Sequence, residues 1–203
     1  MPDDGFDVFD MDGTLLRVNS FQCVTLRLLL KLCVMFRLRA VGWLAWSWLM
    51  RRLRRLSHLE FKKRVVRVFE DHLSEEQKSE LVRHIAEQYT NHAVLDALRR
   101  SPNSVICTAA PYAIAHRMPF AQDVLLVSAL DPARPLEDPT NIGPAKLANL
   151  RSRFGATITI NDVYTDSFED AALIDVAGRA FLVKGSKICA IKPCPFHASD
   201  LSP

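Results

Sequence analysis

A long stretch of the chain has almost none of the residues that interrupt helices. Between Asn19 and Tyr89 there is one glycine, Gly42, and there is no proline. Because glycine and proline are the strongest local breaks in regular structure, their near absence predicts helix after helix across this stretch. The three tryptophans of the chain lie within it, and basic residues crowd between Arg27 and Arg67.

The chain also lacks a large excess of either charge. Its 26 Lys and Arg residues nearly balance 23 Asp and Glu residues, and the net charge of +3 does not indicate a nucleic-acid partner. The five cysteines are an odd number with no paired pattern, which favours a reducing compartment. The N-terminus is acidic, and Asp10 and Asp12 interrupt its apolar residues, so we expect no cleavable signal peptide and a cytoplasmic protein.

On either side of the helical stretch, short β-rich runs end in polar residues. We expect strands at 6–10, 104–108, 124–128, 163–166 and 179–183, with helices between the later ones. This alternation predicts an α/β fold with a Rossmann-like parallel sheet and helices on both faces. The expected domains are a core, residues 1–18 and 90–203, and an all-helical cap, residues 19–89, inserted after the first strand.

Two carboxylates separated by one residue, Asp10 and Asp12, follow the first expected strand. Acids held this close repel each other, and burying them is costly without a cation. A hard divalent cation such as Mg²⁺ would compensate through oxygen ligands, and Gly13 would let the chain turn sharply beside a bound anion. For this motif alone, a solvated acidic turn is the alternative.

Two further polar residues, Thr108 and Asp166, also fall at the ends of expected strands. Ligands of an open parallel sheet bind at the carboxyl ends of its strands. The sequence therefore predicts that Asp10, Thr108 and Asp166 converge on one site.

The run Asp10-Met11-Asp12-Gly13-Thr14-Leu15 resembles the first signature of the haloacid dehalogenase superfamily, the aspartate-nucleophile phosphohydrolases. Thr108, Lys146 and the pair Asp166 and Asp170 match the second, third and fourth signatures in order. Ala109-Ala110-Pro111 is similar to the corresponding run in the phosphoserine-phosphatase-like branch. The resemblance implies a Mg²⁺-dependent phosphatase that forms an aspartyl-phosphate intermediate.

The resemblance also implies a role for each matched residue. Asp10 would be the nucleophile, and Asp12 the general acid and base, with its backbone carbonyl near the metal. Asp170 would hold either Lys146 or a metal-bound water. The expected catalytic residues are Asp10, Asp12, Thr108 and Lys146; the phosphate-binding residues are Gly13, Thr14, Thr108, Ala109 and Lys146; the metal ligands are Asp10, Asp12, Asp166 and Asp170.

Each match has a plainer alternative when taken by itself. Threonines at strand ends and lysines on surface helices are common. Ser167 and Asp170 together could form a helix N-terminal cap, a reading that is compatible with the functional one. Thr165 stands where the family usually has glycine before the fourth signature.

The helical segment lies where the family places a cap over its active site. Asn19 occupies the place where phosphoserine phosphatases have a glutamate that binds the substrate amine, which argues against phosphoserine. Tryptophans beside Arg51, Arg52, Arg54 and Arg55 are a mixture favoured at membrane surfaces, and the layout is similar to C-type phosphatidylglycerophosphatases. We therefore expect a small-molecule or lipid phosphomonoester, with peripheral contact at the inner face of a membrane; a plain cap core is the alternative.

Three rival functions remain open from the sequence. A dehalogenase would keep Asp10 but has no use for an acid at Asp12. A phosphomutase uses both aspartates. A membrane-associated binding or scaffold protein with a relict site would not need to retain all the matched residues.

Overall fold

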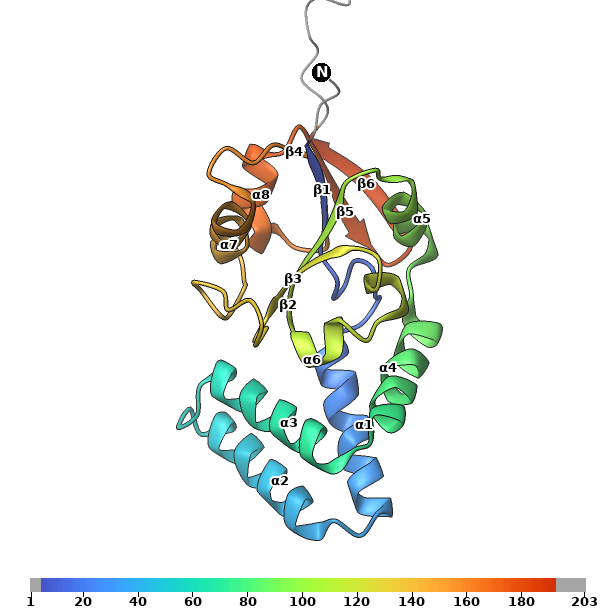
Figure 1. Cartoon of the computed structure of the whole chain (residues 1–203), viewed down its shortest axis with the longest axis vertical. Coiled ribbons are helices and arrows are strands. Elements are labelled where there is room, and N and C mark those ends of the chain that lie inside the picture. The colour runs from blue at the N-terminus through green and yellow to red at the C-terminus, as the bar shows by residue number, and fades with distance from the viewer. Residues whose placement is uncertain (1–4, 193–203) are drawn as a thin grey trace, which may run out of the picture.

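The computed structural model describes residues 5–192; residues 1–4 and 193–203, which belong to the predicted core segments, lie outside it. The described residues form one six-stranded sheet in the order β3-β2-β1-β4-β5-β6 (Figure 1). Its strands are β1 (Phe6–Phe9), β2 (Ser104–Pro111), β3 (Leu125–Ala129), β4 (Ile160–Thr165), β5 (Arg179–Lys184) and β6 (Lys187–Lys192).

The sheet is parallel except at one edge. β1 pairs in parallel with β2 and β4, and β3 and β5 extend the sheet in the same sense. β6 runs antiparallel to β5, with Lys184 opposite Lys187. The strand expected at 179–183 is β5, and the antiparallel strand β6 that follows it was not predicted. Gly185 takes φ +61°, a conformation open to glycine, and lets the chain reverse after β5.

Helices cover both faces of the sheet, which confirms the predicted α/β class. Alternate residues of a strand point to opposite faces, so Val8 and Val105 pack under Leu150 on one side, while Phe9 and Ile106 belong to the core on the other. The helices and short 3₁₀ turns of this part are α5 (His92–Arg100), α6 (Tyr112–Ala115), η1 (Pro119–Ala121), α7 (Pro144–Phe154), η2 (Phe168–Asp170) and α8 (Ala171–Val176).

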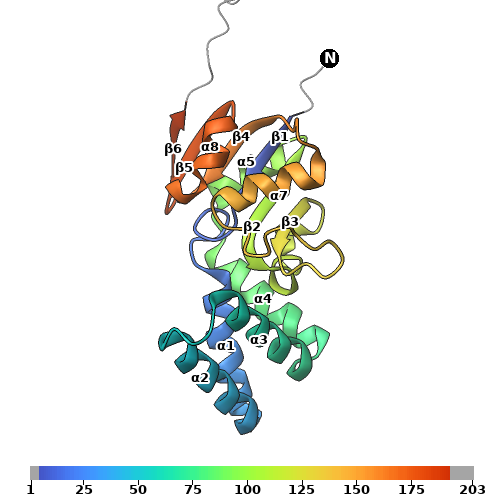
Figure 2. The same ribbon diagram turned by 90° about the vertical axis from the view of Figure 1, so that its left-hand side faces the viewer.

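Four of the five helices between β1 and β2 fill residues 20–89, as the lack of glycine and proline there predicted. They are α1 (Ser20–Val34), α2 (Leu38–Arg52), α3 (His58–His72) and α4 (Glu75–Tyr89). Side-chain caps mark the starts of α1, α3 and α4. Asn19 accepts from the Gln22 amide, Ser57 accepts from the Glu60 amide, and Ser74 and Gln77 form the expected capping box. In both views α1, α2 and α3 lie beyond the carboxyl ends of the strands (Figures 1 and 2).

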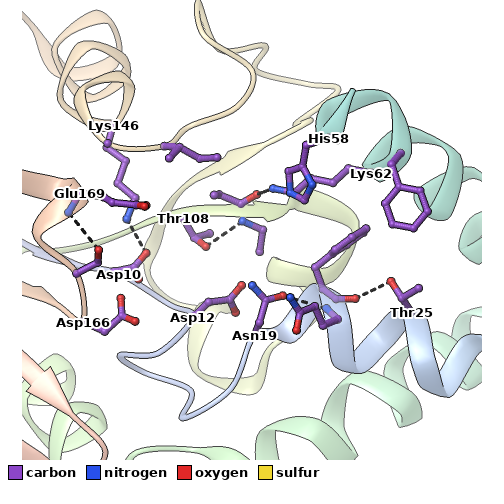
Figure 3. A pocket seen from close by; sticks show the side chains of 18 of the residues that line it. Asp10, Asp12, Asn19, Thr25, His58, Lys62, Thr108, Lys146, Asp166 and Glu169 are labelled. Carbon is purple, nitrogen blue, oxygen red and sulfur yellow. Dashed lines mark hydrogen bonds and ion pairs between the residues drawn. The ribbon is translucent and has the colours of Figure 1, made fainter. Parts of the chain in front are cut away.

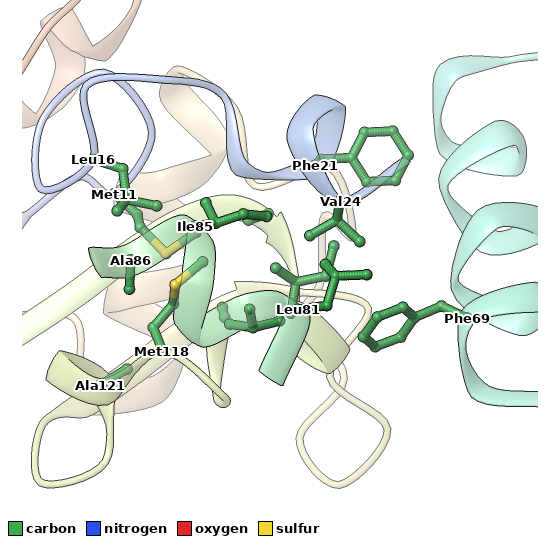
Figure 4. Packing of buried hydrophobic residues seen from close by; sticks show 14 of the residues in the cluster. Met11, Leu16, Phe21, Val24, Phe69, Leu81, Ile85, Ala86, Met118 and Ala121 are labelled. Atoms are coloured by element: carbon green, nitrogen blue, oxygen red, sulfur yellow. The ribbon is translucent and has the colours of Figure 1, made fainter. Parts of the chain in front are cut away.

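One apolar cluster joins these helices to the sheet. Phe21 and Val24 of α1 and Ile85 of α4 are buried in the same cluster as Met11 and Met118 (Figure 4). Fully burying a side chain of this size stabilises a fold by roughly 1.5–3 kcal/mol. The cluster thus anchors α1 and α4 to the sheet, and the predicted domain limits at 18/19 and 89/90 stay predictions.

Over residues 5–192, no helix combines the length and the apolar character that a membrane span requires.

Candidate functional site

A cavity of about 640 Å³ lies between the carboxyl ends of the strands and helices α1, α2 and α3 (Figure 3). The sheet meets these helices there, so residues far apart in sequence share one space. Of the residues predicted for the site, the cavity is lined by Asp10, Asp12, Thr108, Ala109, Lys146, Asp166 and Asp170. Gly13 and Thr14 are not among its lining residues.

A buried ion-pair network crosses the floor of the cavity. The Lys146 Nζ atom, on the first turn of α7, donates to Asp10 Oδ1 at 2.7 Å and to Asp170 Oδ2 at 2.8 Å. Burial raises the pKa of Asp10 to about 7, although Lys146 favours its charged form. Burial alone would lower the pKa of Lys146, but Asp10 and Asp170 raise it above its ordinary value. Lys146 is therefore held as a cation beside Asp10.

Thr165, at the end of β4, contributes to this network in a way that the sequence reading missed. Its hydroxyl is fully buried and donates to Asp170 Oδ2 at 2.8 Å. The same Asp170 oxygen thus accepts from both Lys146 and Thr165. This geometry favours Asp170 as the residue that orients Lys146, and its place among metal ligands stays a prediction. The signal was present in the sequence, where Thr165 departs from the family's usual glycine.

Asp12 lies where the inserted helices begin. Its Oδ1 accepts from the Ser20 amide at 2.9 Å, in the first turn of α1. Burial raises the pKa of Asp12, and the hydrogen bond from the Ser20 amide only partly offsets that rise. A carboxyl group with a raised pKa keeps a proton more readily, which suits a group that must give and take one.

Thr108 lies inside β2, where the pairing with β3 becomes irregular before Pro111. Its hydroxyl accepts from the Ala110 amide at 3.1 Å, so that amide is already engaged. The Ala109 carbonyl accepts from Lys62 Nζ of α3 at 2.7 Å. The 108–110 segment is thus fixed from within and from across the cavity.

Gly13 leaves room for the Asp166 carboxylate beside the turn that follows β1. It takes φ +82°, and a Cβ there would stand 2.1 Å from Asp166 Oδ2. Only glycine lets the Asp166 carboxylate lie this close to the turn after β1. Thr14 is fully buried. The geometry therefore does not favour direct phosphate contact by Gly13 or Thr14, and those roles stay predictions.

Asn141 is a second residue that the sequence reading missed. It is fully buried at φ +50°, a conformation that asparagine tolerates better than most residues. Its side-chain amide donates to the carbonyls of Thr108 and Val127 at 2.8 and 3.0 Å, and its Oδ1 accepts from Asn149 of α7. Asn141 therefore ties β2 and β3 to the helix that carries Lys146. An asparagine just before Gly143-Pro144 was the available signal.

The donor chemistry around Asp10 fits a hard divalent cation. Burial raises the pKa of Asp10, Asp12 and Asp166, so keeping all three charged in the cavity is costly without a further cation. Within residues 5–192, no side-chain partner reaches Asp10 Oδ2 or the Asp166 carboxylate. In that range the structure has no group of three or more His, Cys, Asp or Glu side chains that could hold a metal. The predicted set of four metal ligands is therefore not assembled. The carboxylates of Asp10 and Asp166 remain as candidate oxygen donors in the cavity, and the Asp12 backbone carbonyl stays a prediction from the family resemblance.

A family model described as haloacid dehalogenase-like hydrolase matches residues 8–174. The match starts in β1 and ends in α8, and it contains every residue predicted for the site. A search of curated proteins gives no match.

Several solved structures resemble this chain. A protein with unknown function from Bordetella pertussis Tohama I has a TM-score of 0.63 at 17% identity, covering 87% of this chain and 88% of that one. A HAD family hydrolase from Salmonella enterica serovar Typhi has a TM-score of 0.46 at 13% identity, covering 87% and 61%. A phosphoserine phosphohydrolase-like protein from Francisella tularensis has 0.47 at 11%, covering 87% and 85%. The first likeness supports the fold; the other two are too distant to bear on fold or function.

Proposed function

We propose that this chain, which belongs to the haloacid dehalogenase-like hydrolase family, cleaves a phosphomonoester with Asp10 as the nucleophile. The observation that carries the proposal is the contact of Asp10 with Lys146 at the carboxyl end of β1, inside a cavity large enough for a small organic phosphate. A structural ion pair alone would not need to line such a cavity.

In the first step, a carboxylate oxygen of Asp10 attacks phosphorus and the bond from phosphorus to the leaving alcohol breaks. Asp12 gives its proton to that leaving oxygen. Lys146 offsets the negative charge of Asp10 and of the transferring phosphoryl group, and the Thr108 hydroxyl and the Ala109 amide face the phosphoryl oxygens. The product is an aspartyl-phosphate.

In the second step, Asp12 takes a proton from water, and the water oxygen attacks phosphorus. The bond between phosphorus and Asp10 breaks, which releases inorganic phosphate and restores the carboxylate. Asp12 serves both steps because it has returned to its charged form after the first.

Mg²⁺ is the proposed cofactor, held by Asp10, Asp166 and the Asp12 backbone carbonyl. When bound, such an ion supplies positive charge between the nucleophile and the phosphoryl oxygens. Asp170 is the residue that orients Lys146, because its Oδ2 atom accepts hydrogen bonds from Lys146 and from the buried Thr165 hydroxyl.

We expect the protein to hydrolyse p-nitrophenyl phosphate in Mg²⁺ and to lose at least about 100-fold of that rate in excess EDTA. Restoring Mg²⁺ should restore the rate. A thermal melt with and without EDTA separates loss of the ion from loss of the fold. An undiminished rate in EDTA would contradict the metal assignment, and no turnover of any phosphomonoester would contradict the proposed function.

We further propose that the substrate is an amphiphilic or lipid phosphate taken up beside a membrane. No Asp or Glu occurs between Asp12 and Glu60, while the helices in this range carry exposed arginines. Large apolar side chains are exposed there too: Phe36 is 84% exposed and Trp46 is 55% exposed. An acid-free face with aromatic and basic side chains is suited to an anionic lipid surface.

Liposome flotation tests this contact. We expect the protein to float with vesicles that contain anionic lipid and to float less in high salt. Replacing Phe36 and Trp46 with serine should reduce flotation several-fold, because their apolar area no longer enters the interface. Leu125→Ser is the matched control, since Leu125 is also exposed but lies on β3. Failure to float with either neutral or anionic vesicles would remove the lipid argument.

A further inference from the structure

The cavity has a second group of cations, on the side that faces Lys146. Helices α1, α2 and α3 contribute Arg51 and Lys62 to the lining, and no carboxylate. The opposite wall, from the strands and their following loops, carries all the acids and Lys146. The cavity is therefore divided into an acidic half with one lysine and a basic half without acids (Figure 3).

Lys62 is the buried member of the basic half. It is only 5% exposed, and its one recorded hydrogen bond goes to the neutral Ala109 carbonyl. Its Nζ atom also lies 5.9 Å from the centre of the Phe21 ring. Burial lowers the pKa of Lys62, and Asp12 raises it only in part. An ammonium group has three donors, so Lys62 retains capacity for an anion in the cavity.

Arg51 is the exposed member, on the last turn of α2. Its guanidinium makes no hydrogen bond or ion pair with any residue between 5 and 192. Arginine presents a fork of donors that matches carboxylate and phosphate groups. Arg51 therefore faces the cavity with its donors free for a ligand.

His58 also lines the cavity and adds a polar group beside these two cations in its lining. Burial, Lys62 and Arg51 together lower its pKa to about 4. At neutral pH His58 is thus uncharged and can donate or accept one hydrogen bond.

We infer that Arg51 and Lys62 form a subsite for a second anionic group of the substrate. The preferred substrate is then a phosphomonoester that carries a further carboxylate, phosphate or phosphodiester within the same molecule. The phosphomonoester end lies at Asp10 and Lys146, and the second anion lies against α2 and α3. This inference rests on the proposed function, because it takes Asp10 as the reacting end.

A matched pair of soluble substrates tests the subsite without lipid. Glycerol 3-phosphate and 3-phosphoglycerate differ at one carbon, which is a neutral alcohol in the first and a carboxylate in the second. We expect the wild-type protein to favour 3-phosphoglycerate by roughly tenfold or more in kcat/KM. Arg51→Gln and Lys62→Met should each reduce that ratio several-fold. Arg52→Gln is the matched control, because Arg52 is next to Arg51 and is also exposed but does not line the cavity.

Lys62→Met also removes the bond to Ala109, so Arg51→Gln is the decisive variant if Lys62→Met fails to fold. Calorimetry measures binding separately from the chemistry when the protein carries Asp10→Asn and so does not consume the ligand. In that background, Arg51→Gln should weaken the binding of 3-phosphoglycerate about tenfold. Arg52→Gln should leave this affinity unchanged. If wild-type protein hydrolyses no phosphomonoester while this binding difference persists, the proposed function falls and the subsite stands. Equal substrate ratios or equal affinities in the Arg51→Gln and Arg52→Gln proteins would overturn the subsite.

Discussion

Replacing Asp10 with asparagine should lower the hydrolysis of p-nitrophenyl phosphate by a factor of about 10³ or more. The amide keeps the shape of the carboxylate but cannot form the acyl-phosphate bond. The fold should survive, because burial raises the pKa of Asp10 to about 7 and its charge is therefore costly in the folded protein. Lys146 would keep Asp170 as its partner. We expect the Tm to stay unchanged or to rise.

Asp123→Asn is the matched control for this substitution. Asp123 is an exposed acid in the connection before β3, and it does not line the cavity. Its loss should leave both the rate and the Tm as they are. Similar rates in the Asp10→Asn and Asp123→Asn proteins would remove Asp10 from its proposed role.

Replacing Lys146 with methionine should have the largest effect on stability. Methionine has a similar length, but it leaves Asp10 and Asp170 buried without their shared cation. Removing one partner of a buried ion pair costs about 3–5 kcal/mol. For a chain of this size, that corresponds to a fall in Tm of about 6–20 °C. Activity should fall by about 10² or more, since the charge that faces the phosphoryl group is lost.

Lys63→Met provides the comparison for this prediction. Lys63 forms an exposed pair with Glu60 on α3, and such a pair contributes about 1 kcal/mol or less. Its loss should hardly change the Tm. A second variant, Lys146→Met with Asp170→Asn, should recover part of the lost stability because one of the two uncompensated charges is removed. A Tm for Lys146→Met equal to that of the wild type would contradict the account of the buried network.

The convergence of Asp10, Thr108 and Asp166 could be predicted because each falls at the end of an expected strand, and Lys146 was added from the resemblance to the family. An apolar run that ends in an acid places that acid at the carboxyl end of a strand, and a parallel sheet brings such ends together. Pro144 likewise marks the start of α7, which brings Lys146 to the cavity two residues later. The helical insertion followed from composition alone.

Residues that act through long-range contacts could not be predicted in the same way. Asn141 joins Thr108, Val127 and Asn149, and none of these contacts leaves a periodic signal in the sequence. Lys62 reads as one more basic residue of α3 until the structure buries it against Ala109. β6 was missed because its residues are mostly exposed or half-exposed, so no buried alternation marks it as a strand.

Chemical trapping of the intermediate tests the central claim most directly. The protein is quenched in acid while it hydrolyses p-nitrophenyl phosphate, and it is then reduced with borohydride. Borohydride converts an aspartyl-phosphate to homoserine, and peptide mass spectrometry locates that residue. We expect homoserine at position 10 in the wild-type protein and none in Asp10→Asn. Steady hydrolysis with no modification at Asp10, or with the modification at Asp12 instead, would contradict it.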